Sequence, residues 1–526
     1  MAEWWKGAVI YQIYPRSFQD SNQDGIGDLP GIISQLDYVA DLGVDAIWIS
    51  PFFKSPMHDF GYDVADFCSV DPIFGTMHDF DALIKAAHQK GIKVILDQVY
   101  SHCSIEHAWF QESRQSRDND KADWFVWADP KPDGSPPNNW QSLFAGPAWT
   151  WDARRGQYYL HNFLEQQPDL NIHNTEVQNA LLGAARFWLD KGVDGFRLDA
   201  ANFYMHDQQL RDNPPSDIPA PKRTYEFQSH IHNRSQPENM VFIEKIRALL
   251  DQYEDRCAIA EIGDRHSIDE VVSYCENDNR LHSAYSFVFI ENHDLSPSFV
   301  ESAIEDWREK AAGAWPAWTF SNHDSVRAPS RWRDDYDIRF AKVLNALLLS
   351  LNGSVFLYQG EELGLPQADL AFEDLRDPEA IANWPETLGR DGGRTPIPWS
   401  KDERHGGFSE EHPWLPVDHK HLALAVDQQK DDAHSVLNLT KALIHLRQEN
   451  EALRMGELNF IHRDEQSIGF IRQIDEERIL CLFNLSDKPA PIAIKERDDA
   501  TPYFTIGEHA PGDMLPAFGA FIGKIN

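Results

Sequence analysis

One local pattern recurs three times along the chain: an amphipathic helix ends at a glycine, and an apolar strand follows at once. The three copies read YVADLGVDAIWIS, KAAHQKGIKVILD and FWLDKGVDGFRLD. Gly43, Gly91 and Gly192 stand where a helix end needs left-handed backbone angles, which glycine adopts without steric penalty. Helices that lead directly into apolar strands are typical of a parallel α/β fold.

Five further apolar segments bring the number of predicted strands to eight. They read AVIYQIYP, CAIAEI, SAYSFVFI, AWTFSNHD and SVFLYQGEE. Eight strands that alternate with helices predict an α/β fold of the (β/α)8 TIM-barrel type. A doubly wound open sheet is the alternative architecture. Thr76, and either Asn174 or Thr175, are the predicted N-caps of the helices that end near Gly91 and Gly192.

The spacing of the strands predicts one small domain inserted into the barrel and another after it. Residues 104–170 separate the third strand from the next helix and are rich in Trp, Pro, Asn and Asp. Because a βα loop is seldom so long, we expect an inserted domain there, with the barrel formed by residues 1–103 and 171–456. A second long segment, which follows the eighth strand and interrupts the barrel pattern, covers about residues 363–400. The alternating segment IGFIRQIDEERILCLFNLS predicts an antiparallel β-sandwich domain over residues 457–526.

The net charge of −36 limits the partners that the protein can bind. Such a charge repels nucleic acid and anionic membranes, so we expect neither as a partner. The five cysteines are scattered without a paired spacing, and neither a secretory signal nor a run of 18 apolar residues occurs. These features favour reduced thiols and a cytoplasmic location. They leave open whether the protein is a monomer or a homodimer.

Charged residues stand at the ends of several predicted strands, in KVILDQVYSH, GFRLDA, AIAEIGD and TFSNHD. These residues are Asp97, His102, Arg197, Asp199, Glu261, His323 and Asp324. In a barrel, the C-terminal ends of all strands meet on one face, where catalytic sites lie. We therefore expect these distant residues to share a single pocket.

Arg197 and Asp199 are two positions apart in one strand, so their side chains point to the same face. By this alternation Gly195 joins them inside the barrel, while Phe196 and Leu198 face the helices. A fixed cation beside Asp199 favours the ionised carboxylate, which is the form that a nucleophile needs. An internal salt bridge without a catalytic role is the structural alternative.

A pocket with several carboxylates, but without a Ser–His pair, a catalytic cysteine motif or a phosphate-binding loop, fits glycoside hydrolysis. In that reaction one carboxylate attacks the anomeric carbon and a second protonates the leaving oxygen. A divalent-metal hydrolase that uses Asp97, Asp199, Glu261 and Asp324 is the runner-up, but no histidine spacing of the HExxH type occurs. We expect no organic cofactor.

A separate acidic stretch, DSNQDGIGDLPGI, alternates oxygen-bearing residues around a glycine turn. It is similar to the first part of an EF-hand loop, but Gly31 stands where an EF-hand has glutamate, so it is not one. We expect a structural Ca²⁺ or Mg²⁺ in this loop. The candidate ligands are Asp20, Asn22, Asp24, Ile26 and Asp28. A solvated acidic turn is the alternative.

The combined motifs resemble the α-amylase family of glycoside hydrolases (family 13), in its α-glucosidase and oligo-1,6-glucosidase branch. The resemblance rests on DQVYSH, GFRLDAAN, AEIGD and FSNHD, with GYD at 61–63 and QPDLN at 167–171. The opening VIYQIYPRSFQDSNQDGIGDL and the late GRDGGRTPIPW match the same branch. The matches run in the order of the family from residue 4 to about residue 400.

The resemblance implies roles for the matching residues. Asp199 would be the nucleophile, Glu261 the general acid/base, and Asp324 the residue that binds sugar hydroxyls and helps to distort the ring. Arg197 would orient Asp199, and Asp97 would support its neighbours.

The same resemblance implies a set of substrate-binding residues. His102 and His323 would hydrogen-bond the glucosyl unit, Tyr62 would stack on it, and Phe163 would line the same subsite. Asp59 and Arg394 would form an ion pair that closes the pocket over the non-reducing end.

The implied activity is that of an exo-acting, retaining α-glucosidase on short α-glucosides or malto-oligosaccharides, with transglucosylation as a side reaction. In this branch the residue after the nucleophile goes with linkage preference: valine with α-1,6 and a smaller residue with α-1,4 cleavage. Ala200 stands there, so α-1,4 cleavage is expected. The alternatives are an oligo-1,6-glucosidase, or a sucrose isomerase or trehalose synthase of the same family. The acid/base motif reads EIGD instead of the commoner EMPG, which puts the aglycone side in question.

Overall fold

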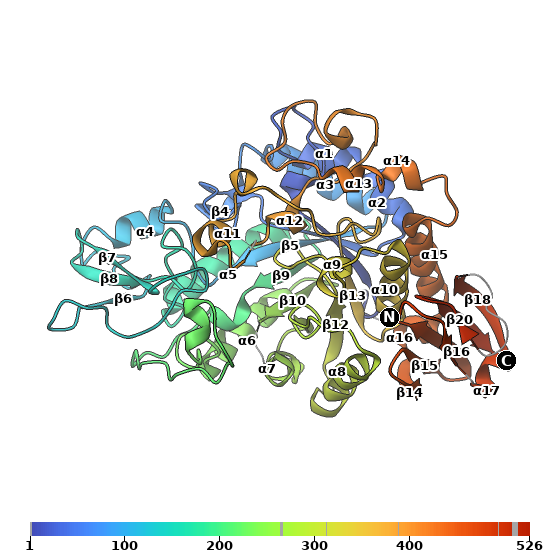
Figure 1. The fold of residues 1–526 in the computed structure, drawn as a ribbon. Helices are drawn as coiled ribbons and strands as arrows, with labels where there is room; N and C mark the ends of the chain where they lie inside the picture. Colours follow the sequence, from blue (N-terminus) through green and yellow to red (C-terminus); the bar gives the residue numbers. More distant parts are fainter. Residues whose placement is uncertain (1–2, 264–266, 312, 388, 493, 508–513) are drawn as a thin grey trace.

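A closed barrel of eight parallel strands forms the centre of the protein (Figure 1). The computed structural model describes residues 3–263, 267–311, 313–387, 389–492, 494–507 and 514–526. The strands are β1 Val9–Ile13, β2 Ala46–Ile49, β5 Lys93–Val99, β9 Gly195–Asp199, β10 Cys257–Ile262, β11 Ser283–Ser286, β12 Trp315–Thr319 and β13 Ser354–Tyr358. Strand β13 pairs with β1 and closes the ring. Each strand overlaps a predicted one. The (β/α)8 prediction is therefore confirmed, and the doubly wound alternative is wrong.

The helices around the barrel begin and end where the sequence has capping residues. Thr76 forms a capping box with Asp79, and the Asn174 side chain accepts a hydrogen bond from the backbone of Glu176. Gly91 and Gly192 have φ angles of 76° and 95°, as the helix–glycine–strand pattern requires. The helices are α1 Leu29–Ser34, α2 Leu36–Leu42, α3 Met77–Gln89, α5 Thr175–Asp190, α6 Met240–Leu250, α7 Ser267–Cys275, α8 Pro297–Lys310, α10 Ile338–Ser350 and α15 Val436–Glu449.

The barrel strands separate two hydrophobic cores. Trp48, Ile259 and Phe356 belong to a small cluster inside the barrel. Phe196 and Leu198 belong to the large cluster between the strands and the helices. The alternation predicted for β9 is thus observed, and it leaves Arg197 facing the barrel interior.

The predicted inserted segment carries its own small sheet. Strands β6 Trp127–Ala128, β7 Trp149–Asp152 and β8 Gln157–Leu160 pair in the order β6-β8-β7, with α4 Ala108–Ser113 before them. Trp140 and Trp149 are buried in a separate cluster there. Figure 1 shows these strands projecting from one side of the barrel. A two-stranded hairpin, β3 Phe53–Lys54 and β4 Asp66–Val70, follows β2. The exact boundaries of this domain stay a prediction.

The C-terminal segment folds into an antiparallel sheet in the order β14-β15-β16-β20-β18. The strands are β14 Glu457–Arg463, β15 Ser467–Ile474, β16 Glu477–Asn484, β18 Ala500–Ile506 and β20 Ala520–Ile525, with a further pair of β17 Ala490–Pro491 and β19 Met514–Leu515. Buried Arg472 of β15 donates hydrogen bonds of 2.8 Å to the carbonyls of Ser350 and Gly456. This arginine therefore joins the sheet to the end of α10.

The segment after β13 folds back toward the barrel in short helices, including α11 Pro378–Asn383 and α12 Asp391–Arg394.

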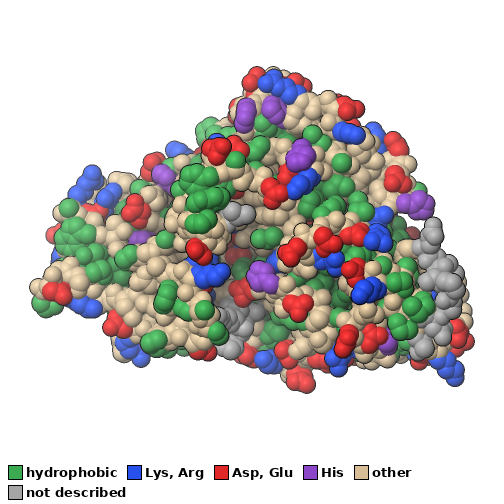
Figure 2. Space-filling view, in the orientation of Figure 1, with side chains coloured by type: hydrophobic (Ala, Val, Ile, Leu, Met, Phe, Trp, Pro, Cys, Tyr) green, Lys and Arg blue, Asp and Glu red, His purple; other side chains and the backbone are tan. Residues whose placement is uncertain are grey.

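All five cysteines are free thiols. Among the residues that the structure describes, no helix has the length and apolar character needed to cross a bilayer. Acidic side chains are spread over the face shown in Figure 2, and that face is hollowed near its middle.

Candidate active site

Three neighbouring strands bring the central charged residues together. In the sheet register Asp97 of β5 is paired with Arg197 of β9, and Val99 is paired with Asp199. Strand β10 lies on the other side of β9 and ends at Glu261–Ile262. Because parallel neighbours end at the same edge of the barrel, three acids from distant sequence segments surround one arginine.

Arg197 binds all three carboxylates through its two terminal nitrogens. Nη1 lies 2.8 Å from Asp97 Oδ1 and 2.5 Å from Asp199 Oδ1, and Nη2 lies 2.5 Å from Glu261 Oε1. Its guanidinium also lies 4.8 Å from the centre of the Trp48 ring. Arg197 has no exposed surface, so it is a rigid cation that holds Asp199 and Glu261 on the two arms of one planar group.

Gly195 makes room for this arrangement in the barrel interior. A Cβ atom at Gly195 would lie 2.7 Å from the Cys257 carbonyl oxygen and 2.9 Å from its sulfur, which is closer than real contacts allow. Any larger residue would therefore push β9 away from β10, and with it Arg197 from Glu261.

Asp199 and Glu261 differ in how their oxygens are used. Glu261 Oε2 accepts a hydrogen bond of 3.0 Å from the Ala200 backbone, and Oε1 accepts one of 3.2 Å from the Tyr285 hydroxyl. Asp199 Oδ1 is held by Arg197, whereas Oδ2 has no hydrogen-bond partner among the described residues. Asp199 thus presents one free carboxylate oxygen in an oriented, nearly buried position.

Burial raises the pKa values of two carboxyl groups in this cluster. Burial raises the pKa of Asp97 to about 6, although Arg197 opposes the shift. Burial also raises the pKa of Asp199 well above its usual range; Arg197 opposes this, while the charges of Glu261 and Asp97 add to it. Asp97 and Asp199 therefore keep a proton to a higher pH than isolated carboxyl groups would, and burial outweighs the preference for the ionised form that Arg197 was expected to give Asp199.

A chain of hydrogen bonds runs from β1 across the pocket to Asp97. The side-chain amide of Gln12 lies 2.8 Å from Nδ1 of His323, and Nε2 of the same ring lies 2.5 Å from the Tyr62 hydroxyl. That hydroxyl donates to Asp97 Oδ2 at 3.0 Å. Burial lowers the pKa of His323 well below its usual range, so the ring is neutral and carries its proton on Nε2.

Tyr62 also stacks on His323, with ring centres 5.3 Å apart and planes 11° apart. One ring face of Tyr62 is therefore used inside the protein. The predicted stacking of Tyr62 on a sugar stays a prediction and concerns the other face.

Asp324 follows β12 and is the most accessible acid of the pocket, with 31% of its side chain exposed. Nη2 of Arg394 lies 2.6 Å from its Oδ1, and Nε2 of His323 lies 3.1 Å from its Oδ2. Burial alone would raise the pKa of Asp324, but His323, Arg394 and Arg390 outweigh it and hold the pKa well below its usual range. Asp324 is thus an ionised acceptor that faces the open part of the site.

The predicted ion pair between Asp59 and Arg394 is wrong in this structure. Arg394 donates hydrogen bonds to two other groups: Nη2 donates to Asp324 Oδ1, and Nε donates to the His323 carbonyl at 2.6 Å. Arg390, one helical turn earlier, binds Asp59 instead, with Nη2 2.8 Å from Oδ1. Asp377 fixes Arg390 there: its Oδ1 lies 2.7 Å from the same nitrogen, and it has no exposed surface. Asp59, Arg390 and Asp377 therefore form a bridge of charges beside Asp324.

His102 and Phe163 lie together on the side of the inserted segment. Nε2 of His102 lies 3.1 Å from the Tyr62 carbonyl, and burial lowers the pKa of His102 to about 4, so it is neutral at pH 7. The Phe163 ring lies 5.0 Å from His102 and 5.2 Å from Phe203, with Phe144 beyond it at 5.9 Å. This side of the pocket is an aromatic wall.

All ten predicted catalytic and substrate-binding residues therefore meet around the C-terminal ends of the barrel strands. The supporting residues that escaped the sequence reasoning include Gln12, Trp48, Tyr285, Asp377 and Arg390. Gln12 offered a signal, because it is a polar residue in the middle of an apolar strand. Arg390 offered another, as the first arginine of the quoted GRDGGR motif.

The acidic loop at residues 20–28 is ordered by its own side chains. Asp20 accepts hydrogen bonds from the backbones of Asn22, Gln23 and Gly25, and Asp28 accepts from Ser21 and Gly31. Carboxylate and amide oxygens of this kind suit Ca²⁺ or Mg²⁺. Within the described residues, no group of three or more His, Cys, Asp or Glu side chains is arranged as a metal site. The metal stays a prediction that rests on the oxygen-rich loop alone.

The closed (β/α)8 barrel carries Asp199 and Glu261 on one buried arginine, and Asp199 keeps a free carboxylate oxygen beside an aromatic wall. This arrangement defines a glycoside hydrolase of the two-carboxylate class. The family model described as "Alpha amylase, catalytic domain" matches residues 12–456. The chain belongs to the α-amylase family, in the branch of the α-glucosidases and oligo-1,6-glucosidases.

Relatives match over almost the whole chain. A "Probable alpha-glucosidase" of Rhizobium meliloti (strain 1021) is 49% identical over 538 residues, covering 99% of this chain and 97% of its own length. An "Oligo-1,6-glucosidase" of Heyndrickxia coagulans is 36% identical, with 95% of each chain covered. The crystal structure of the "alpha-glucosyl transfer enzyme, XgtA" superimposes with a TM-score of 0.96 at 50% identity and covers 100% of both chains.

Proposed function

We propose that the protein is an exo-acting, retaining α-glucosidase that releases α-glucose from the non-reducing end of short α-glucosides, with α-1,4 links preferred. The observation that carries the proposal is the Arg197 centre, which holds Asp199 and Glu261 while it leaves Asp199 Oδ2 free. The two carboxyl groups bind the two ends of one guanidinium, which suits the separation of about 5–5.5 Å used for double displacement.

In the first step Asp199 Oδ2 attacks the anomeric carbon, and Glu261 protonates the leaving oxygen. This forms a β-glucosyl-enzyme. In the second step Glu261 takes a proton from water, and the water oxygen attacks the same carbon, breaks its bond to Asp199 and releases α-glucose with a free Asp199 carboxylate. Arg197 keeps Asp199 oriented in both steps, and the ionised Asp324 accepts hydrogen bonds from the sugar hydroxyls.

Exo action is supported by the closed end of the pocket. The bridge of Asp59, Arg390 and Asp377 joins the loop after β2 to the segment after β13. Asp324 and Arg394 lie beside it. A pocket that ends in fixed charges accepts one terminal sugar, whose hydroxyls pair with those charges, and leaves no room for a longer chain beyond it.

The linkage preference rests on Ala200. Its backbone lies in the left-handed region, with φ 40° and ψ 48°, and its N–H donates to Glu261. A methyl group there leaves more space for the leaving sugar than valine would. Relatives described as α-glucosidase and as oligo-1,6-glucosidase both match, so the oligo-1,6-glucosidase is the second candidate.

Transglucosylation is proposed as a side reaction, because a sugar hydroxyl can replace water in the second step. The similarity to a structure described as an α-glucosyl transfer enzyme supports it. We also propose a structural Ca²⁺ or Mg²⁺ held by the oxygens of the loop at residues 20–28, with no part in the chemistry.

The test is the first product formed from maltose, followed by NMR before the anomers equilibrate. α-Glucose is expected, and β-glucose would exclude double displacement. Asp199→Asn should abolish turnover at an unchanged melting temperature, while Asp334→Asn, an exposed acid elsewhere on the barrel, should behave as wild type. Initial rates on maltose, isomaltose and sucrose separate the candidates: faster isomaltose cleavage favours the oligo-1,6-glucosidase, and rearranged disaccharides from sucrose favour an isomerase.

A further inference from the structure

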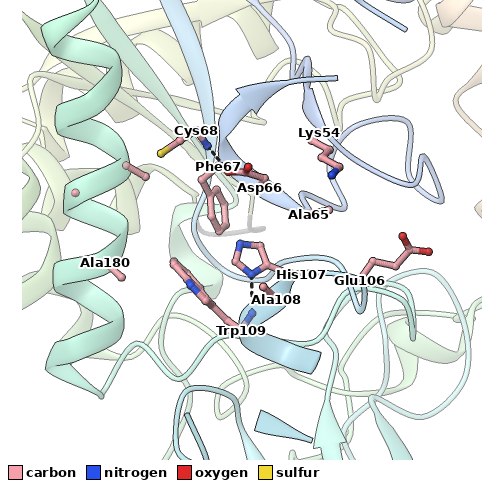
Figure 3. Close-up of a pocket in the computed structure, with 12 residues that line it drawn as sticks. Lys54, Ala65, Asp66, Phe67, Cys68, Glu106, His107, Ala108, Trp109 and Ala180 are labelled. Carbon is pink, nitrogen blue, oxygen red and sulfur yellow. Dashed lines mark hydrogen bonds between the residues drawn. The ribbon is translucent and has the colours of Figure 1, made fainter. Parts of the chain in front are cut away.

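A second cavity, of about 610 Å³, lies outside the barrel and apart from the catalytic residues. Its walls come from the β3–β4 hairpin, the start of α4 and the middle of α5 (Figure 3). The side chains that matter most are Lys54, Asp66, Phe67, Glu106, His107 and Trp109. The volume is within the usual range for small-ligand sites, roughly 300–1,000 Å³.

His107 is a built polar group in this cavity. Only 5% of it is exposed, and its Nδ1 accepts a hydrogen bond of 3.1 Å from the Trp109 backbone as the N-cap of α4. Burial lowers the pKa of His107 to about 4, so the ring is neutral and its single proton is on Nε2. Among the described residues Nε2 has no hydrogen-bond partner. The cavity therefore presents an oriented N–H donor that the protein itself does not use and that a ligand or water can reach.

Two aromatic rings pack beside this donor. The rings of Phe67, His107 and Trp109 form a cluster in which each ring contacts the other two (Figure 3). The centres of the Phe67 and Trp109 rings are 5.6 Å apart, and those of His107 and Trp109 are 4.4 Å apart. The opposite wall is flat, because α5 presents only Ala180, Gly183 and Ala184 to the cavity. A flat ligand with C–H faces can lie between the helix and the rings.

The rim selects against charged ligands. Asp66 and Glu106 are exposed carboxylates and Lys54 is an exposed ammonium, so the rim is negative by one charge and repels anions, as does the chain's net charge of −36. A cation gains nothing from the His107 N–H and is repelled by Lys54. A neutral ligand with many hydroxyl groups can accept from His107 and Lys54 and donate to the two carboxylates.

We propose that this cavity is a second binding site for a neutral oligosaccharide, on the outer face of the barrel beside α5. Rings of the sugar pack between Trp109 and the small residues of α5, and their hydroxyls pair with His107 and the charged rim. The proposal rests on the proposed function only for the choice of a malto-oligosaccharide as probe.

Gly183 offers a clean way to close the cavity. It lies on the exposed side of α5, and a Cβ atom added there meets nothing within 4 Å. Gly183→Trp therefore projects a large side chain into the space where the ligand would lie. Gly183→Ala is the matched control, because it stabilises the helix and leaves the space open.

The experiment titrates maltotriose into the inactive Asp199→Asn protein and counts sites by calorimetry. Two sites are expected for Asp199→Asn and for Asp199→Asn/Gly183→Ala, and one for Asp199→Asn/Gly183→Trp. Glu106→Gln, which alters the rim without touching the core, should weaken only the second site, about threefold to tenfold. One site in all three proteins, or a second site that Gly183→Trp leaves unchanged, overturns the proposal.

Failure of the proposed function gives a different pattern. If the barrel pocket did not bind α-glucosides, the Asp199→Asn protein would keep a single site. That site would be lost in Gly183→Trp and untouched by Asp324→Asn.

Discussion

Replacement of Arg390 by alanine tests the proposal that the charge bridge of Asp59, Arg390 and Asp377 closes the pocket. Only 8% of this side chain is exposed, and one of its nitrogens serves both Asp59, at 2.8 Å, and Asp377, at 2.7 Å. Arg390→Ala leaves two buried carboxylates without their cation. It also moves a positive charge away from Asp324, whose Oδ1 lies 3.4 Å from Arg390 Nη1.

The size of the effect follows from the burial of the partners. Burial alone would raise the pKa of Asp377, but Arg390 overcomes this and brings it to about 2, from 3.8. That difference corresponds to about 2.5 kcal/mol of preference for the ionised form. Breaking a buried ion pair from one side costs about 3–5 kcal/mol. Since the proposed function places Asp59 at the border of the sugar subsite, we expect about 3 kcal/mol of this in transition-state binding, or roughly a 10²-fold lower kcat/KM.

The assay is kcat/KM for 4-nitrophenyl α-D-glucoside, with the melting temperature measured in parallel. Arg390→Lys keeps the charge but loses the planar fork, so it should fall between wild type and Arg390→Ala. Arg376→Ala removes an exposed arginine of the same segment and should change kcat/KM less than twofold. A kcat/KM of Arg390→Ala within threefold of wild type would refute the view that this bridge shapes the sugar subsite.

Three further predictions concern strain, protons and metal. Ala200→Val places a β-branched residue at φ 40°, so it should cost about 1–3 kcal/mol of stability and raise the isomaltose-to-maltose rate ratio. The control Ala200→Gly should leave stability nearly unchanged. An unchanged melting temperature for Ala200→Val would contradict the strain argument. Burial lowers the pKa of His206 from 6.5 to about 3. Between pH 6.5 and pH 3, the unfolded chain therefore binds a proton on this histidine that the folded protein does not bind. The free energy of unfolding then falls by about 1.4 kcal/mol for each pH unit as the pH drops through this range. His206→Gln should remove that slope. In urea unfolding, the difference in unfolding free energy between wild type and variant should therefore fall by about 1.6 kcal/mol from pH 6.5 to pH 5. Equal slopes would show that His206 does not titrate as described. A chelator should lower the melting temperature, and added Ca²⁺ or Mg²⁺ should restore it, in wild type but not in Asp24→Ala; no effect would leave the loop at residues 20–28 as a solvated turn.

The barrel itself was predictable because its signals are local. A strand between parallel neighbours is buried on both faces, so it appears as a short apolar run, and a helix that turns into such a strand needs a left-handed residue. Gly91 and Gly192 carry this signal, and both have the expected angles. The positions of Asp97, Asp199 and Glu261 at strand ends then place them on one face, since the fold allows no other arrangement.

The partners of each charge were not predictable in the same way. Arg390 and Arg394 are four residues apart in one short segment, and either could reach Asp59. The choice depends on Asp377, which holds Arg390, and on the His323 carbonyl, which holds Arg394. These contacts join segments separated by 13 and 71 positions along the chain, so no local pattern records them.

By itself the sequence determined the order of strands and helices, the alternation that turns Arg197 and Asp199 inward, and the family whose motifs these residues match. The tertiary structure alone decided which arginine meets which acid, which oxygen of Asp199 stays free, and that His107 faces a cavity beside α5. The reason is physical: periodicity and capping act over a few residues, whereas ion pairs and cavities depend on how whole elements pack against one another.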